Sequence, residues 1–178
     1  MRFGGELGLN MANVSESPAP SPSPTMAIGA RVGVIAEFGI TDAIFIQPGV
    51  MFSMMGFKVD PITAHLNYIH IPINIVYKLD AGPGKIFFGL TPFLSYGVSA
   101  SLSGLPSGAS GTIEFGSNAG QVKPLDFGAG INVGYELEMG LFFRAGYDYS
   151  LANSSNVSGV TDHNTCIHIG AGYFFGGK

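Results

Sequence analysis

Apolar and polar residues alternate along most of the chain with a period of two. Between Leu66 and Asp80, isoleucine stands at every second position, while His70, Asn74 and Lys78 stand among the positions between. This period places successive side chains on opposite faces of a β-strand. The pattern recurs eight times between turn residues, and no comparable run has helical periodicity. We predict strands at residues 2–12, 26–39, 43–57, 65–79, 86–101, 124–137, 141–151 and 165–175.

The connections between these strands alternate in length. Short turns, ITDA, DAGPGK and EMG, follow the second, fourth and sixth strands. The other connections are longer and polar: NVSESPAPSPSPT, KVDPITA, a Gly/Ser-rich run over residues 102–122, and ANSSNVSGVTDHN. Short turns at one end and long loops at the other are typical of an up-and-down antiparallel transmembrane barrel. The alternating prolines of the first loop predict an extended segment.

The bulk of the apolar face decides which face points inward. An eight-stranded barrel has an interior just wide enough for modest side chains, and the apolar faces of eight such strands are too large for it. We therefore predict that the apolar face contacts lipid. The clearest lipid-facing residues are Ile69, Ile71, Ile73, Ile75, Phe127, Ile131 and Val133.

The other face carries glycines, polar residues and the charges that lie within the strands. A charge facing lipid would cost about 2–4 kcal/mol at the midplane, so this face should line a narrow lumen. We expect an odd-length turn around Gly140 to place Glu136 opposite Arg144, and a bulge or a missing ladder bond at Pro72. The predicted lumenal network is Arg2, Glu6, Arg31, Glu37, His70, Asn74, Lys78, Asp126, Asn132, Glu136, Arg144, Asp148 and His168.

Aromatic residues of the apolar face gather near the strand ends, which predicts two interfacial girdles. On the short-turn side they are Phe3, Phe38, Tyr77, Phe88, Tyr135 and Phe175. On the loop side they are Phe52, Tyr96, Phe127 and Tyr149.

Composition agrees with a membrane barrel. The 178 residues suit one domain, and only 11% are charged, against roughly a quarter in soluble proteins. The net charge of −4 is dispersed, which argues against a nucleic-acid partner. Every apolar run is shorter than the roughly 18 residues of a membrane helix. The N-terminus has no continuous apolar stretch of the signal-peptide kind, so the protein is either cytoplasmic or a mature form whose leader has been removed, and the barrel pattern favours the mature form.

Several segments resemble a known family. They are FGGELGLNMA, LNYIHIPINIVYKL, FFGLTPFLSYG, LDFGAGINVGYEL and IHIGAGYFF, and together they cover nearly the whole chain. They look like the outer-membrane β-barrel family of Bacteroidetes often called PorT-like. The resemblance implies the outer membrane of a Gram-negative cell, a lipid bilayer as partner and a barrel-assembly machinery during insertion. Such barrels commonly end on an aromatic residue, so we interpret the Gly-Gly-Lys after Phe175 as a cloning remnant.

Residue types that carry chemistry are sparse. His70 and His168 lie on the inner face without metal-ligand spacing around them, so we expect no metal and no cofactor. Cys166 is interpreted as a small lumenal filler. Some outer-membrane barrels are hydrolases, and the loop-side candidates for such chemistry would be Asp162, His163, Ser154 and Ser155. These residue types are common in any polar loop.

The sequence favours a non-enzymatic, monomeric, integral outer-membrane barrel with both termini periplasmic. Its lumen should be largely filled, and its role structural or dependent on loops that bind an extracellular ligand. Two alternatives stay open: a narrow pore for small solutes, and an accessory part in protein secretion, which the family resemblance suggests.

Overall fold

The computed structural model describes residues 1–19, 23–105, 111–118 and 121–176. In these residues there are nine β-strands, no α-helix, and thus no helix able to span a membrane. The strands are β1 (Arg2–Ser17), β2 (Thr25–Gly39), β3 (Ile44–Val59), β4 (Ile62–Asp80), β5 (Gly84–Ser103), β6 (Gly111–Ile113), β7 (Leu125–Leu137), β8 (Leu141–Ser150) and β9 (Thr161–Phe175).

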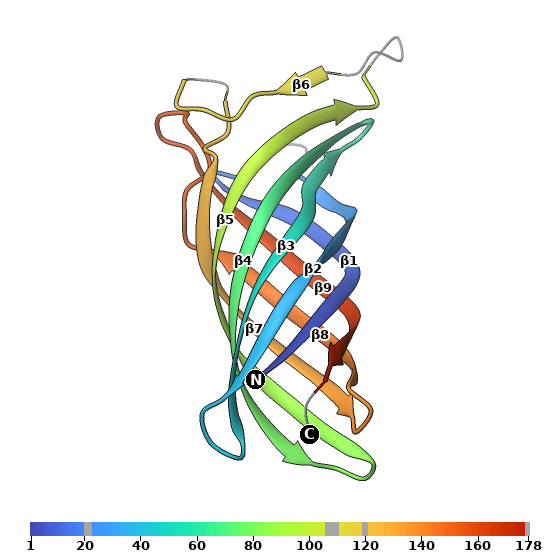
Figure 1. Ribbon diagram of the computed structural model, residues 1–178. Helices are drawn as coiled ribbons and strands as arrows, with labels where there is room; N and C mark the ends of the chain where they lie inside the picture. Colours follow the sequence, from blue (N-terminus) through green and yellow to red (C-terminus); the bar gives the residue numbers. More distant parts are fainter. Residues whose placement is uncertain (20–22, 106–110, 119–120, 177–178) are drawn as a thin grey trace.

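The strands close into a barrel (Figure 1). Hydrogen-bonded neighbours follow the order β4-β3-β2-β1-β9-β8-β7-β5, and β4 also pairs with β5, so the ring of eight antiparallel strands has no open edge along its main body. The short β6 is attached to β5 beyond the ring. The predicted all-β barrel of eight strands is confirmed. Closure pairs the backbone polar groups, as a hydrocarbon environment requires.

The alternation in the sequence appears as alternation of exposure. Along β4, Ile71, Ile73 and Ile75 are exposed, whereas His70 and Asn74 are buried. The outward apolar stripe of this strand runs from Leu79 to Ile69, about ten steps of about 3.4 Å, which at a tilt of about 40° gives a band about 26 Å tall. That height matches the hydrocarbon thickness spanned by outer-membrane barrels.

Several predicted loop boundaries are wrong, because β1 continues to Ser17 and β9 begins at Thr161, both within segments predicted as loops. Only Asp60 and Pro61 separate β3 from β4, because both strands continue through most of the segment KVDPITA. The run over residues 102–122 forms a long connection from β5 to β7, as predicted, and contains the short strand β6, which pairs with Ala100–Leu102 of β5. Residues 20–22, 106–110, 119–120 and 177–178 lie outside the described residues, so the predictions for the proline-rich loop, parts of the Gly/Ser-rich run and the C-terminal tail stay predictions.

The expected pairing of Glu136 with Arg144 is also wrong. Residues 138–140 connect β7 to β8, and the register places Glu136 opposite Phe142 and Arg144 opposite Gly134. Gly140 has φ +93°, in the left-handed region, as a tight hairpin connection requires. The pairing is centred on Met139 rather than on Gly140, which shifts each partner by two residues.

Pro72 interrupts the ladder without changing the register. Between β3 and β4, the residue pairing stops after Pro48–Ile73 and resumes at Met51–His70, so it is missing beside Pro72. Both pairs belong to the same register. The register shift of β4 against β5 lies instead between Asn67 and Tyr68. Of the two outcomes expected at Pro72, the structure thus has a local loss of pairing and no bulge.

Glycine on the inner face makes room for aromatic rings. A Cβ atom added to Gly134 would lie 2.2 Å from the ring of Phe87, and one added to Gly172 would lie 2.2 Å from the ring of Phe142. The small residues of this face therefore accommodate large side chains from neighbouring strands, and the lumen is filled by both.

Candidate functional site: the barrel lumen

The predicted lumenal residues lie inside the barrel. All of them are buried except Arg2, whose side chain is 19% exposed at the short-turn mouth. Sequence reasoning missed further buried polar residues on the same face, which alternation along the strands could have identified: Asn10, Gln47, Ser53, Thr91, Ser95 and Asn164. It also missed the inward aromatic residues Phe45, Phe87, Phe93, Phe142 and Phe174.

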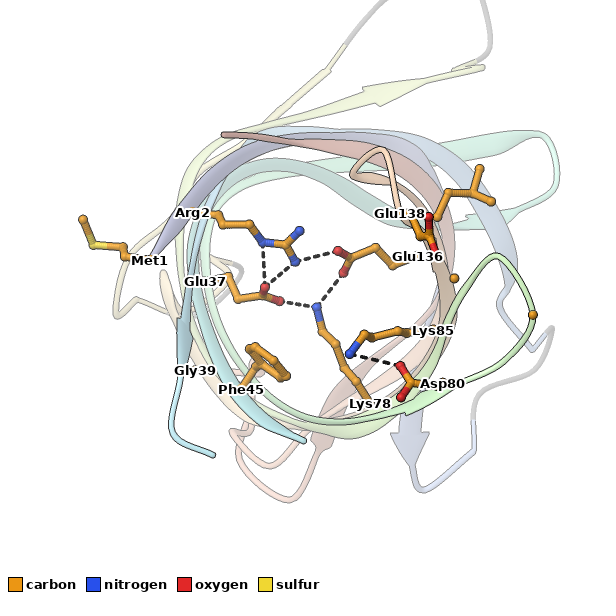
Figure 2. A pocket seen from close by; sticks show the side chains of 13 residues that line it. Met1, Arg2, Glu37, Gly39, Phe45, Lys78, Asp80, Lys85, Glu136 and Glu138 are labelled. Carbon is orange, nitrogen blue, oxygen red and sulfur yellow. Dashed lines mark hydrogen bonds and ion pairs between the residues drawn. The ribbon is translucent and has the colours of Figure 1, made fainter. Parts of the chain in front are cut away.

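Four charges close the lumen near the short turns. Lys78 Nζ lies 2.5 Å from Glu37 Oε2 and 2.5 Å from Glu136 Oε2. Arg2 bonds the same two carboxylates, with Nε donating to Glu37 over 2.9 Å and Nη2 lying 2.6 Å from Glu136 Oε1. Figure 2 shows these side chains pointing toward one another across the mouth. We call these four residues the charge ring; its two cations and two anions balance.

A cavity, here called the vestibule, opens from the charge ring toward the short turns. This cavity of about 910 Å³ is lined by ring residues and by Phe45, Asp80, Lys85 and Glu138. Lys85 and Asp80 form a 3.1 Å ion pair at its rim, away from the ring. The vestibule ends where Arg2 and Lys78 bridge the carboxylates.

An apolar layer lies next to the charge ring. Ile35, Val76, Phe87, Phe142 and Phe174 form one buried cluster, with Phe45 packed against it. The two cations of the charge ring also contact phenylalanine side chains of the apolar layer. Arg2 lies 4.4 Å from the ring centroid of Phe174, and Lys78 lies 4.6 Å from the ring centroid of Phe45. Charge pairing and packing therefore close the lumen together at this level.

Polar side chains fill the middle of the lumen. Arg144 donates to Glu6 Oε2 over 2.8 Å and to Gln47 Oε1 over 2.5 Å. Arg31 lies 3.8 Å from Glu6 and 3.9 Å from Asp148. The buried charges thus approach opposite charges from other strands, as burial in a medium of low dielectric requires.

Neutral residues extend this network. Asn132 Nδ2 donates to Thr91 Oγ1 over 2.8 Å, and Thr91 donates to Asn74 Oδ1 over 2.9 Å. His70 Nδ1 lies 2.8 Å from Ser95 Oγ, and His168 Nε2 lies 3.6 Å from Asp148. Within the described part of the chain, no three His, Cys, Asp or Glu side chains form a group suited to a metal ion.

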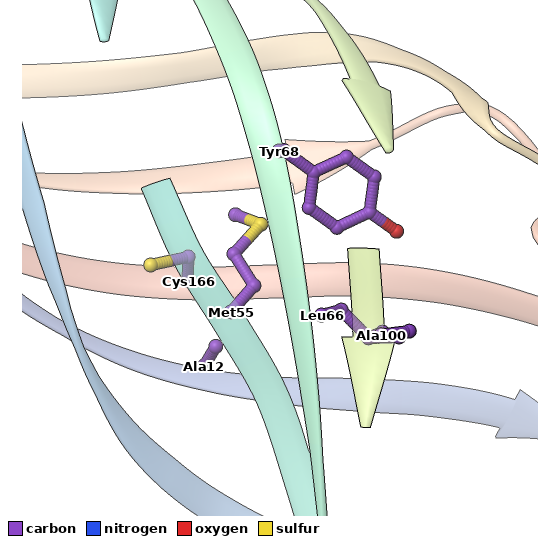
Figure 3. Close-up of a cluster of buried hydrophobic side chains, with 6 residues drawn as sticks. All are labelled: Ala12, Met55, Leu66, Tyr68, Ala100 and Cys166. Atoms are coloured by element: carbon purple, nitrogen blue, oxygen red, sulfur yellow. The ribbon is translucent and has the colours of Figure 1, made fainter. Parts of the chain in front are cut away.

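A second apolar cluster closes the lumen on the loop side. Figure 3 shows Ala12, Met55, Leu66, Tyr68, Ala100 and Cys166, which come from β1, β3, β4, β5 and β9. Phe115, from the loop after β6, packs edge-on against Tyr68 with ring centroids 5.6 Å apart. Nearby, Asp126 Oδ2 accepts hydrogen bonds from Ser150 and Asn164 over 2.8 and 3.0 Å.

The loop-side residues considered for catalysis do not converge. Ser154, Ser155 and Asp162 line a pocket of about 190 Å³ inside the rim, and Ser154 Oγ donates to the backbone oxygen of Asp162 over 3.2 Å. The side chain of His163 points to the opposite face of β9 from that of Asp162. Its ring stacks on Tyr149, with centroids 5.6 Å apart, and its Nδ1 lies 3.1 Å from the backbone oxygen of Ala152. The serines, the carboxylate and the imidazole therefore form no relay.

The residues predicted to face lipid lie on the outer surface. Ile71, Ile73, Ile75, Phe127, Ile131 and Val133 are exposed, and Ile69 is partly covered. The aromatic residues of the two predicted girdles are likewise exposed, except Tyr135, which is partly buried and donates a 2.7 Å hydrogen bond to the backbone oxygen of Ala81. Register places Phe52, Ile69 and Tyr96 side by side on β3, β4 and β5.

A family model for the outer membrane protein beta-barrel domain matches residues 1–156. The chain belongs to this family. Membership in the outer membrane protein beta-barrel family, with the apolar outer band, places the protein in an outer membrane. The comparison with curated proteins gives no match.

Solved structures share the fold of this outer-membrane barrel. Neisserial surface protein A is 18% identical, with 97% of each chain covered and a TM-score of 0.56. OprG from Pseudomonas aeruginosa is 12% identical, with 99% of this chain and 96% of that chain covered and a TM-score of 0.55. The outer membrane enzyme PagL is 11% identical, with 94% and 98% covered and a TM-score of 0.53. At these identities the likeness concerns the fold.

Proposed function

We propose that the protein is a non-enzymatic, integral outer-membrane barrel with a closed lumen, and that its role is structural or depends on binding at its loops. The observation that carries this proposal is the succession of barriers along the lumen. The charge ring and the apolar layer beside it stand at one end, and the Tyr68 cluster stands at the other. A solute would have to displace all of them.

The energetics of the charge ring favour a permanently closed state. Both cations bridge both carboxylates, so opening the ring would separate four buried or half-buried charges. Breaking a buried ion pair costs about 3–5 kcal/mol when one charge is left without its partner. A steady pore of the kind considered from the sequence would need a continuous aqueous path instead.

The proposal that the protein is not an enzyme rests on the loop-side geometry. Nucleophilic catalysis needs a hydroxyl and a base within hydrogen-bond reach and a third group that orients the base. Here Ser154 and Asp162 line the inner pocket, while His163 stacks on Tyr149. The fold shared with an outer membrane enzyme carries no activity to this chain, because fold alone does not determine function.

Conductance across a planar lipid bilayer tests the closed lumen. We expect the full chain, inserted as a monomer, to give no steady single-channel current at moderate voltage. A matched variant, Lys78→Gln, removes one cation of the ring. Steady current in the wild type whose ion selectivity changes in Lys78→Gln would overturn the proposal in favour of a pore lined by these residues.

A finer placement among the PorT-like barrels of Bacteroidetes is a separate proposal, supported by the segments quoted from the sequence. If it holds, components of a secretion apparatus are candidate partners, alongside the barrel-assembly machinery. A pull-down from native membranes tests this. Recovery of the barrel without secretion components would favour the structural or ligand-binding role.

A further inference from the structure

The barrel wall continues past the lipid-facing band along β3, β4 and β5. β3, β4 and β5 extend beyond Phe52, Ile69 and Tyr96 as far as Val59, Ile62 and Ser103. Figure 1 shows these strands rising beyond the body of the barrel, with β6 alongside the end of β5. This extension carries a surface that the closed lumen does not explain.

The outward-facing residues change from apolar to polar beyond Ile69 and Tyr96. Along β4 the outward stripe changes from isoleucine to Asn67, His65 and Thr63. Their partners on β5 change in the same way, and we call the combined set the outer polar strip: Thr63, His65, Asn67, Ser99, Ser101 and Ser103. A register shift at Asn67–Tyr68 marks the change, and bulges are common at barrel rims.

Hydrogen bonds join residues of the strip across the two strands. Asn67 Nδ2 donates to Ser99 Oγ over 3.0 Å, and Ser103 Oγ lies 3.4 Å from His65 Nε2. The reverse side of the same strands is packed, because Ala64, Leu66 and Ala100 are buried. Pairing with β6 covers the edge of β5 at Ala100–Leu102. These contacts restrain the side chains of the strip, which lowers the entropic cost of binding.

The charge of the strip selects among possible ligands. Its described residues carry amide, hydroxyl and imidazole groups, and the neighbouring cation Lys58 is paired with Asp60 at 2.9 Å. A surface that binds anionic head groups is rich in lysine and arginine. Because the strip lies directly beyond the lipid-facing Ile69 and Tyr96, it stands at the level of the lipid head groups. We propose that the outer polar strip binds the uncharged sugar residues of glycolipids in the surrounding leaflet.

Lipid retention tests this proposal with the full chain. The barrel is inserted into vesicles that contain equal parts of dioleoyl phosphatidylcholine, phosphatidylglycerol and digalactosyldiacylglycerol, so that only the head groups differ. It is then extracted in limiting zwitterionic detergent, and the lipids retained per barrel are measured by mass spectrometry. Removing two neutral hydrogen-bonding side chains should lower the preference for the galactolipid by about fivefold or more.

Two double variants separate the strip from the rest of the rim. Asn67→Ala with Ser99→Ala removes a hydrogen-bonded pair of the strip. Ser15→Ala with Ser17→Ala removes exposed serines of β1, across the ring. Heat-modifiable migration on a gel checks that each variant folds.

We expect the wild type and the β1 variant to enrich the galactolipid and the strip variant to retain lipids at their bulk ratio. Equal retention of the three lipids by the wild type, preference for phosphatidylglycerol, or undiminished enrichment by the strip variant would each overturn the proposal. The closed lumen is tested independently by conductance.

Discussion

Replacing Lys78 by methionine should destabilise the barrel strongly. The side chain is 1% exposed, and its ammonium group bonds both Glu37 and Glu136. Methionine has a similar length and keeps most of the packing against Phe45 and Phe174, so the substitution chiefly removes the charge. Arg2 would then be the cation left to bridge two carboxylates near the mouth.

The magnitude follows from the geometry of the ring. Removing one partner of a buried ion pair typically costs about 3–5 kcal/mol, because the other charge stays buried without compensation. The vestibule admits solvent on one side of the ring, which places the expected loss in free energy of unfolding at the lower end, about 3 kcal/mol. The double variant Lys78→Met with Glu136→Gln removes one charge of each sign, so it should recover about half of that loss or more.

Urea titration in lipid vesicles measures these differences. The chain contains no tryptophan, so folding is followed by heat-modifiable gel migration and by far-ultraviolet circular dichroism. Glu138→Gln, at the rim of the vestibule, is a matched control and should be nearly neutral. A loss below about 1 kcal/mol in Lys78→Met, or a double variant no more stable than the single one, would refute the idea that paired charges close this end.

Three further outcomes are expected. Ile73→Lys, in the middle of the outward stripe, should lower the free energy of unfolding by about 2–4 kcal/mol. Thr63→Lys, on the same face beyond the girdle, should lower it by about 1 kcal/mol or less. Equal losses would contradict the assigned lipid boundary. Cys166, buried in the Tyr68 cluster, should react with a charged thiol reagent at least about a hundredfold more slowly in the folded barrel than in urea, and equal rates would show an open lumen. The wild type should release no product from phospholipid, lipid A or peptide substrates; product formation that disappears in His163→Ala would reveal an active site.

The direction of each side chain was predictable because it depends on local alternation. Parity along β4 is enough to turn His70, Asn74 and Lys78 inward once lipid is taken as the outer solvent. The same rule applied to every strand would have found Asn10 and Gln47. The inward position of Phe87 and Phe142 needed a further step, since it depends on glycines such as Gly134 and Gly172 in neighbouring strands.

The ends of the strands were less predictable for a physical reason. Apolar and polar residues alternate because one face of a strand contacts lipid and the other lines the lumen. Beyond the membrane the outward face is polar too, so the alternation is lost. Thr63 therefore looks like a loop residue in the sequence, although it continues β4. The tight connection at Asp60 and Pro61 was hidden by the same loss of contrast.

Partners across the lumen lie beyond what alternation can determine. Lys78 meets Glu136 across a separation of 58 residues, and Arg144 meets Glu6 across 138. Which inward side chains meet depends on the stagger of the strands and the radius of the closed barrel, and these are properties of all eight strands together. The error at Glu136 and Arg144 was local: both residues point inward, but the hairpin is centred on Met139 rather than on Gly140, which gave each a different partner. Whether such a lumen is open or closed therefore depends on the register of the whole ring, since the same inward charges can line a channel or bridge it.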